Sequence, residues 1–270
     1  MTSHYRILSV GLAAILFIIS CARVPVTGRR QMNMLPESEL ISLSLNEYSS
    51  FLKKNPAMPS SNEDAAKVKQ IGSKIQRSVT TYMQQHKLAR RLEGYKWEFN
   101  LVNDKTINAW CMPGGKVVVY TGLLDVTQNE NALAIVMGHE IAHAVARHGN
   151  ERMSQQLMAQ MGGIALSVAL QNQDTQTRTL FEQAYGIGAG VGVILPFSRL
   201  HETEADKMGL IFAAMAGYDP REAPKFWQRM SAKGGSKPPA FLSTHPSDSK
   251  RISDLNKFMP QAMKYYKPSS

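Results

Sequence analysis

Apolar residues recur at spacings of three and four along most of the chain, a pattern that predicts mainly helical structure. The helices are expected over residues 36–54, 62–91, 127–148, 151–170, 200–216, 220–233 and 247–259. The period changes to alternation at Trp97, Phe99 and Leu101, which would share one face of a strand, and two further strands are expected around Pro113-Gly114-Gly115. Helices combined with a small antiparallel hairpin sheet define an α+β fold.

The helix expected at 127–148 is almost wholly apolar in its second half, so it should be buried. Thr127 and Glu130 form a capping-box pattern at its start, and Gly149 stands just past its end, a position that glycine favours. Gly138 in its interior costs about 1 kcal/mol relative to Ala. A close approach by the sheet or by another helix would explain that glycine.

Three polar residues, His139, Glu140 and His143, interrupt this apolar helix. Each would cost about 1–3 kcal/mol if it were buried without a partner. His139 and His143 lie four residues apart, so their imidazoles project from one face and suit two ligands of a tetrahedral Zn²⁺. Glu140 reaches beside the metal, where a general base can take a proton from the attacking water. The alternative is a histidine pair satisfied within an ordinary core.

A catalytic zinc needs a third protein ligand. His148 points away from the other two histidines and is out of register with the metzincin spacing, so we expect a helix-end residue that interacts favourably with the dipole. Glu202 and Asp206 lie four apart on the next well-formed helix, where Glu202 can bind the metal and Asp206 can accept the free N–H of a ligating imidazole. The alternative is a solvated acidic face, because Glu204 also lies in this turn.

These motifs resemble the zinc metallopeptidase family that contains the CAAX prenyl protease, HtpX, the Oma-type protease, BepA and LoiP. The resemblance rests on HExxH followed by ETEAD, together with NAWCMPGG, RHG and HPSDSKRI. It implies one zincin-like metallopeptidase domain over 36–260, followed by a tail at 261–270. It also implies that His139, His143 and Glu202 hold one zinc ion and that Glu140 is the catalytic base.

The resemblance further assigns residues that the local pattern leaves undecided. His245 and Arg251 correspond to a His and an Arg over the metal that stabilise the oxyanion, or, for the His, close the open zinc position as a latch. Taken alone, His245 is a turn residue before a proline. Asn108 and Ala109 correspond to the strand edge on which zincins align a peptide by main-chain pairing.

An apolar run over residues 7–19 follows a basic residue near the N-terminus. The run is shorter than the roughly 20 residues of a membrane span, so it predicts a signal peptide over 1–20. The sequence IISCA resembles a bacterial lipobox, which implies lipidation of Cys21, a tether over 21–35 and an outer-membrane anchor facing the periplasm. A plain signal peptide with an incidental cysteine is the alternative.

Composition changes this picture little. The chain has 31 Lys and Arg against 21 Asp and Glu, a net charge of +10, but the basic residues are dispersed, so nucleic acid is not expected as a partner. Cys111 reads as a small buried apolar residue. The glycine-rich segment 185–199 is either a mobile lid or a buried helix end.

The sequence therefore predicts a lipid-anchored periplasmic zinc endopeptidase whose substrates are unfolded or misassembled proteins of the cell envelope. Two alternatives belong to other classes. One is a chaperone-like or binding lipoprotein that holds zinc with His245 in the fourth position and has little turnover. The other is a basic nucleic-acid-binding domain, whose binding would depend strongly on salt.

Overall fold

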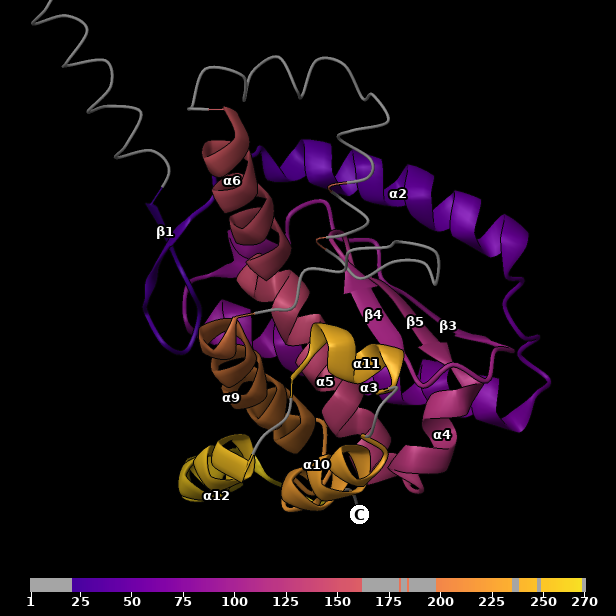
Figure 1. Cartoon of the computed structure of the whole chain (residues 1–270). Coiled ribbons are helices and arrows are strands. Elements are labelled where there is room, and N and C mark those ends of the chain that lie inside the picture. The colour runs from indigo at the N-terminus through magenta and orange to yellow at the C-terminus, as the bar shows by residue number, and fades with distance from the viewer. Residues whose placement is uncertain are drawn as a thin grey trace, which may run out of the picture.

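The computed structural model describes residues 21–161, 180, 184, 198–234, 238–246 and 249–268. Helices predominate and surround a small sheet, which confirms the predicted α+β class (Figure 1). In chain order the elements are β1 (Cys21–Arg23), β2 (Arg30–Met32), α2 (Glu37–Lys54), α3 (Glu63–Gln85), η1 (Ala89–Leu92), β3 (Glu98–Val102), β4 (Ala109–Met112), β5 (Lys116–Tyr120), α4 (Thr121–Thr127), α5 (Glu130–Ala146), α6 (His148–Met161), α9 (Arg199–Met215), α10 (Glu222–Ala232), α11 (Ala240–Thr244), α12 (Ser249–Ala262) and η2 (Met263–Tyr265).

The main sheet has the strand order β3-β5-β4. Strands β4 and β5 form the expected antiparallel hairpin, which turns at Gly114 and Gly115 with φ of +83° and +82°, values that glycine adopts without strain. Strand β3 joins this hairpin by pairing parallel to β5, so the complete sheet is mixed. The chain leaves β3, runs back along β4 at the far edge and returns through β5 in the middle, which gives β3 and β5 the same direction.

The two faces of the sheet pack against different helices. Trp97, Phe99 and Leu101 contribute to the same apolar cluster, as predicted, and this cluster includes residues of α3, α5 and α9. Cys111 is buried in it too. Trp110 belongs to the cluster on the opposite face, which α2 covers (Figure 1). The sheet thus supports α5 from one side.

Helix α5 is buried along its length, as its apolar sequence predicts, but both of its ends differ from the prediction. Asn129 is the N-cap in place of Thr127, because the Asn129 side chain accepts a hydrogen bond from a backbone N–H of the first turn. At the other end Arg147 adopts the left-handed conformation, with φ of +63°. The helix therefore stops before His148, and Gly149 lies inside the next helix, α6.

Helices α5 and α9 cross at two glycines. A Cβ atom at Gly138 would lie 2.9 Å from the backbone oxygen of Gly209, and a Cβ at Gly209 would lie 2.8 Å from the backbone nitrogen of His139. The predicted close approach at Gly138 is therefore confirmed, and the partner is a helix. This contact holds α9, which carries Glu202 in its first turn, against α5.

The other predicted helices follow their expected ranges closely, with one exception, while α4 and α11 lie where no helix was predicted. The helix expected at 62–91 divides into α3 and η1, because the chain reverses at Lys87, whose φ is +59°. None of the helices in the described ranges has the length and apolar character that crossing a membrane requires. The expected signal peptide, residues 162–170 of an expected helix and nearly all of the expected lid at 185–199 lie outside the described residues.

The segment expected to be a tether, 21–35, packs on the domain. Strands β1 and β2 pair as an antiparallel hairpin, and Val24 between them is buried in the main core. Arg91 donates hydrogen bonds to the backbone oxygen of Arg23 at 3.0 Å and to the side chain of Gln31 at 2.6 Å. The structure differs from a free tether because these apolar and polar contacts fix the hairpin.

Candidate metal centre

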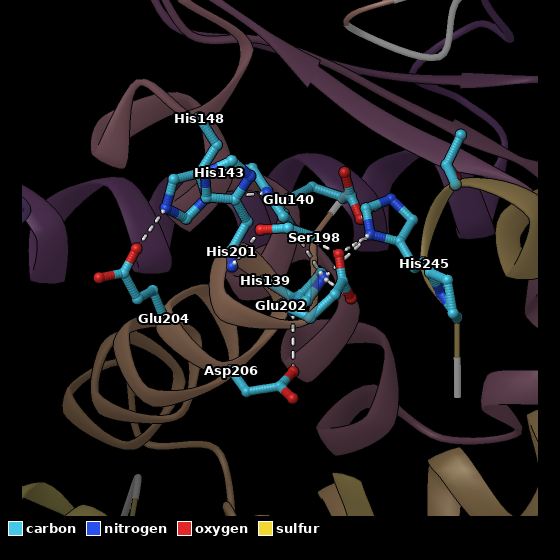
Figure 2. A network of polar contacts seen from close by, with 12 residues as sticks. His139, Glu140, His143, His148, Ser198, His201, Glu202, Glu204, Asp206 and His245 are labelled. Carbon is cyan, nitrogen blue, oxygen red and sulfur yellow. Dashed lines mark hydrogen bonds and ion pairs between the residues drawn. The ribbon is translucent and has the colours of Figure 1, made fainter. Parts of the chain in front are cut away.

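Four buried side chains from three segments place their donor atoms within 4.8 Å of one another. His139 and His143 come from α5, Glu202 comes from the first turn of α9, and His245 follows α11 (Figure 2). The i, i+4 spacing puts both histidines on the face of α5 that meets α9. The structure thus brings together the three predicted zinc ligands and the predicted latch residue.

The separations between these donor atoms fit a single tetrahedral ion. The Nε2 atoms of His139 and His143 are 3.0 Å apart, and they lie 3.5 Å and 3.3 Å from the carboxylate of Glu202. The Nδ1 atom of His245 lies 3.0 Å from Glu202 Oε1 and 3.2 Å from His139 Nε2. Ligands about 2.0–2.2 Å from a tetrahedral zinc are about 3.3–3.5 Å from each other. Three imidazole nitrogens and one carboxylate oxygen also match the ligand types that zinc takes.

Glu140 lies beside this cluster and does not belong to it. Its side chain is buried, and its Oε1 atom has no hydrogen-bond partner in the part of the chain that the structure describes; His245 Nε2 lies 3.4 Å away. Burial raises the pKa of Glu140, although the positive charge that His245 and His139 can carry opposes the shift. A buried carboxylate oxygen left open next to metal donors can accept a proton from a bound water.

Asp206 and Arg251 support the cluster from behind His139. The Oδ1 atom of Asp206 is 2.9 Å from His139 Nδ1, the position predicted for an acceptor of the imidazole N–H. Arg251 donates to both oxygens of Asp206 at 2.7 and 2.8 Å, pairs with Glu202 at 2.6 Å, and stacks 3.4 Å over the ring of Trp227. Burial disfavours ionised carboxylates, but Arg251 and the histidines outweigh it and hold the pKa of Glu202 and Asp206 below their ordinary values.

The two α5 histidines have opposite protonation tendencies when no metal is bound. Burial lowers the pKa of His139, but Glu202 and Asp206 outweigh burial and raise this pKa to about 9. Burial dominates at His143, whose pKa falls well below its ordinary value. A metal ion must therefore displace a proton from His139, whereas His143 is already neutral.

His148 and Glu204 have positions that the sequence did not predict. His148 Nδ1 lies 3.0 Å from His143 Nδ1, and His148 Nε2 lies 3.2 Å from Glu204 Oε2 (Figure 2). The expectation of a helix-end residue facing away from the metal was wrong, because the turn at Arg147 directs His148 back toward α5. Glu204 is buried, so the alternative of a solvated acidic face fails as well. The local pattern held no signal for either contact, which depends on how two helices pack.

Asn108 and Ala109 lie at the sheet and not among the metal donors. Ala109 begins β4, the strand at the end of the sheet order, and β4 packs against α5. The backbone oxygen of Asn108 accepts a hydrogen bond from Tyr120 at 3.1 Å, so the hairpin fixes this segment. The predicted substrate strand is therefore an edge strand next to the active-site helix, and its pairing with a peptide stays a prediction.

A helix carrying His-Glu-x-x-His, a carboxylate ligand from a second helix and an adjacent edge strand define a metallopeptidase of the zinc-dependent class. The chain belongs to peptidase family M48, whose family model matches residues 69–259. Zinc is the cofactor of this family, and the four donors suit one zinc ion. The family resemblance drawn from the motifs is thereby confirmed.

Three relatives place the chain within this family. It is 32% identical to the human metalloendopeptidase OMA1, mitochondrial, over 95% of this chain and 49% of the human protein. It is 40% identical to the mitochondrial metalloendopeptidase OMA1 of Schizosaccharomyces pombe, over 62% of this chain and 48% of that protein. It is 36% identical to the beta-barrel assembly-enhancing protease of Yersinia pestis, over 58% of this chain and 33% of that protein. The chain spans about half or less of the length of these relatives, and membership of the lipoprotein branch stays a prediction.

Proposed function

We propose that this protein is a zinc-dependent endopeptidase that hydrolyses peptide bonds of unfolded or misassembled proteins of the cell envelope. The observation that carries the proposal is the open carboxylate oxygen of Glu140 beside the four-donor cluster. A structural zinc site has no use for such a group, whereas peptide hydrolysis needs a base at this place. Membership of a peptidase family and the names of its relatives, two of them metalloendopeptidases, support the same reaction class.

Each residue of the centre has a defined task in this reaction. When bound to His139, His143 and Glu202, zinc supplies a Lewis acid that polarises the scissile carbonyl and makes a water molecule more acidic. Glu140 accepts the proton of the attacking water and passes it to the leaving amine, a task for which a raised pKa is suited. His245 would act as a latch, because its Nδ1 atom lies 3.0 Å from Glu202 Oε1 among the metal donors and can hold the fourth zinc position until a substrate takes it.

Other residues orient these groups. Arg251 is bound by two carboxylates, so its main task is to hold Glu202 and Asp206 in place, and its positive charge also favours the developing oxyanion. The edge strand that begins at Ala109, with Asn108 before it, can pair with the substrate main chain. Recognition through the main chain depends little on side chains, which suits a protease of unfolded proteins.

The base is tested by Glu140→Gln, which keeps the shape of the side chain and removes its basicity. We expect cleavage of unfolded casein to fall at least about a hundredfold, the usual contribution of a general base. Glu130→Gln is the matched control, because Glu130 is an exposed carboxylate on the same helix. The zinc content of each purified variant is measured alongside. Full activity of zinc-loaded Glu140→Gln would refute the proposal.

We also propose that the protein is anchored through a lipidated Cys21 on the outer membrane and faces the periplasm. The lipobox-like sequence supports this location, and one bacterial relative is named for enhancing β-barrel assembly. Metabolic labelling with a palmitate analogue in a bacterial host should mark the wild type and not Cys21→Ser. An intact mass that corresponds to an unmodified N-terminus after cleavage at Ser20 would contradict the proposal. With such an anchor, the partners of the protein would be the membrane and unfolded proteins, and we propose no nucleic-acid partner.

A binding protein that holds zinc with little turnover is the second candidate. The observation in its favour is that His245 completes a set of four protein donors, as in closed structural sites. The two candidates differ in the behaviour of His245→Ala. Release of an open coordination position should increase proteolysis if the protein is an enzyme and should leave it negligible if the site is structural.

A further inference from the structure

A continuous chain of polar contacts links the N-terminal hairpin, residues 21–32, to the metal ligand His143. Glu204 accepts hydrogen bonds from Thr27 Oγ1 at 2.8 Å and from Arg29 Nε and Nη2 at 2.9 Å each. The same carboxylate lies 3.2 Å from His148 Nε2, and His148 Nδ1 lies 3.0 Å from His143 Nδ1. Segments far apart in the sequence therefore meet directly behind one zinc ligand.

The donors and acceptors along this chain can be assigned from its ends. A carboxylate only accepts hydrogen bonds, so His148 Nε2 must carry the hydrogen that points to Glu204. His143 must keep a lone pair on Nε2 to bind the metal, so its hydrogen lies on Nδ1. His143 Nδ1–H then donates to His148 Nδ1, which can accept only if His148 is neutral. One arrangement of hydrogens therefore satisfies the contacts between Glu204, His148 and His143.

The two α5 ligands are thus oriented in different ways. The Nδ1 atom of His139 meets the carboxylate of Asp206 directly, at 2.9 Å, whereas the Nδ1 atom of His143 meets His148, which in turn contacts the carboxylate of Glu204. The arrangement at His143 contains one more side chain, so His148 and Glu204 must themselves be held in place. Arg29 supplies this support, because the guanidinium also binds Glu151 at 2.6 and 2.8 Å and thereby ties α6 to α9.

Stacking adds to this support. The ring of His201 lies 4.5 Å from that of His148 with an interplanar angle of 21°, and His201 Nε2 is 3.0 Å from Glu151. Glu204 therefore contacts the edge of the His148 ring and His201 stacks on its face. Arg29 binds Glu204, the partner of His148, and Glu151, the partner of His201. Movement of the hairpin would disturb both supports together.

We propose that His148 and Glu204 are positioning residues that fix the tautomer and the orientation of the zinc ligand His143, and that the N-terminal hairpin locks them in place through Arg29. This inference deepens the proposed function and rests on the zinc centre assigned above. It makes the hairpin a part of the metal site, although the sequence placed this segment outside the catalytic domain.

The hairpin contact is tested by comparing Arg29→Gln with Arg229→Gln. Arg229 is a matched control, because its side chain is 24% exposed against 22% for Arg29 and it also forms an ion pair, with Glu222 at 2.9 Å, away from the metal donors. Zinc affinity is measured by competition with a fluorescent chelator at fixed pH. We expect Arg29→Gln to bind zinc about tenfold or more weakly, the usual effect of losing an outer partner of a ligand, and Arg229→Gln to bind like the wild type.

The tautomer is tested by ¹⁵N NMR of the histidine rings in the zinc-loaded protein and in the metal-free protein. In the wild type His143 should carry its hydrogen on Nδ1 in both states, and in metal-free His148→Phe it should populate both tautomers. Unfolding midpoints show whether each variant is folded. If His148→Phe is unfolded, His148→Gln is used in its place, because its amide oxygen can still accept a hydrogen bond from His143. His148→Gln should then bind zinc more tightly than His148→Ala.

The outcomes separate this inference from the proposed function. Equal zinc affinities of Arg29→Gln and Arg229→Gln, or mixed tautomers of His143 in the metal-free wild type, would overturn the inference. If Arg29→Gln and Arg229→Gln differed in zinc affinity as predicted but the wild type showed no proteolysis, the proposed endopeptidase activity would be refuted and the inference would stand. Both measurements are made without substrate, so neither depends on turnover.

Discussion

Replacement of Gly138 by Ala should weaken zinc binding through the packing of two helices, without touching any ligand. The new Cβ would lie 2.9 Å from the backbone oxygen of Gly209, where α5 and α9 cross. A comfortable carbon–oxygen contact is about 3.3 Å or more, so the helices must separate by about 0.4 Å. The obstacle is a backbone atom, and no side-chain rotation can relieve it.

That displacement is large for a metal site. Zinc–ligand distances are held within about 0.2 Å, whereas separation of the helices moves Glu202 relative to His139 and His143 by about twice that amount. We therefore expect zinc binding to weaken about tenfold. The effect on unfolding should be smaller, because overpacking costs about 1–3 kcal/mol and the gain in helix propensity offsets about 1 kcal/mol. A net loss of about 1 kcal/mol lowers Tm by about 2–4 °C.

Gly72→Ala provides the control for this prediction. Its Cβ would lie 2.2 Å from the ring of Phe99, so it overpacks the contact between α3 and the sheet, away from the metal donors. Chelator competition and thermal unfolding of the metal-free proteins are measured for both variants. Gly72→Ala should lose stability and keep its zinc affinity. If Gly138→Ala bound zinc as tightly as the wild type, the helix crossing would not set the geometry of the site.

Four further predictions concern the ligands themselves. His245→Ala should bind zinc more weakly and, when saturated with zinc, cleave unfolded casein faster than the wild type; slower cleavage would show that His245 acts in turnover and is no latch. Zinc affinity should rise about tenfold per pH unit from pH 6.5 to 8.5, because the metal displaces the proton of His139, whose pKa is about 9; a flat profile in competition titrations would contradict this. The same raised pKa stabilises the metal-free protein below pH 6.5 and ceases to do so as the pH rises through 9, so its Tm should fall over that interval. Removal of zinc with a chelator should lower Tm and its return should restore it, whereas Glu202→Ala should show no response.

The main elements of the site could be predicted because each depends on the spacing of residues within a single helix. The i, i+4 spacing of His139 and His143 fixes their common face, and the same spacing pairs Glu202 with Asp206 on α9. The apolar surroundings of α5 show that its polar groups need partners. Gly138 even indicated that something packs closely there, although its partner could not be identified from the sequence.

The outer support of the site could not be predicted, because it depends on where α5 ends. An ideal helix that continued past Arg147 would direct His148 away from the zinc ligands, and the left-handed conformation of Arg147 reverses that direction. Arg147 is an ordinary residue for a helix interior, so no glycine marks the turn. The role of Arg29 was harder still to predict, because its two acidic partners lie on helices more than a hundred residues away in the sequence.

When all three carboxyl groups around the donor cluster are ionised, a divalent cation balances the buried charge. Glu140, Glu202 and Asp206 contribute negative charges when ionised, Arg251 contributes one positive charge, and the ligating imidazoles are neutral. A doubly charged zinc ion cancels the remainder, and uncompensated buried charge is costly. Without the ion, a proton on His139 offsets part of the excess, which is the physical reason that the pKa of this histidine is raised although it is buried. Proton release on zinc binding and the raised pKa of His139 therefore have one origin, three buried carboxyl groups that share the positive charge of Arg251.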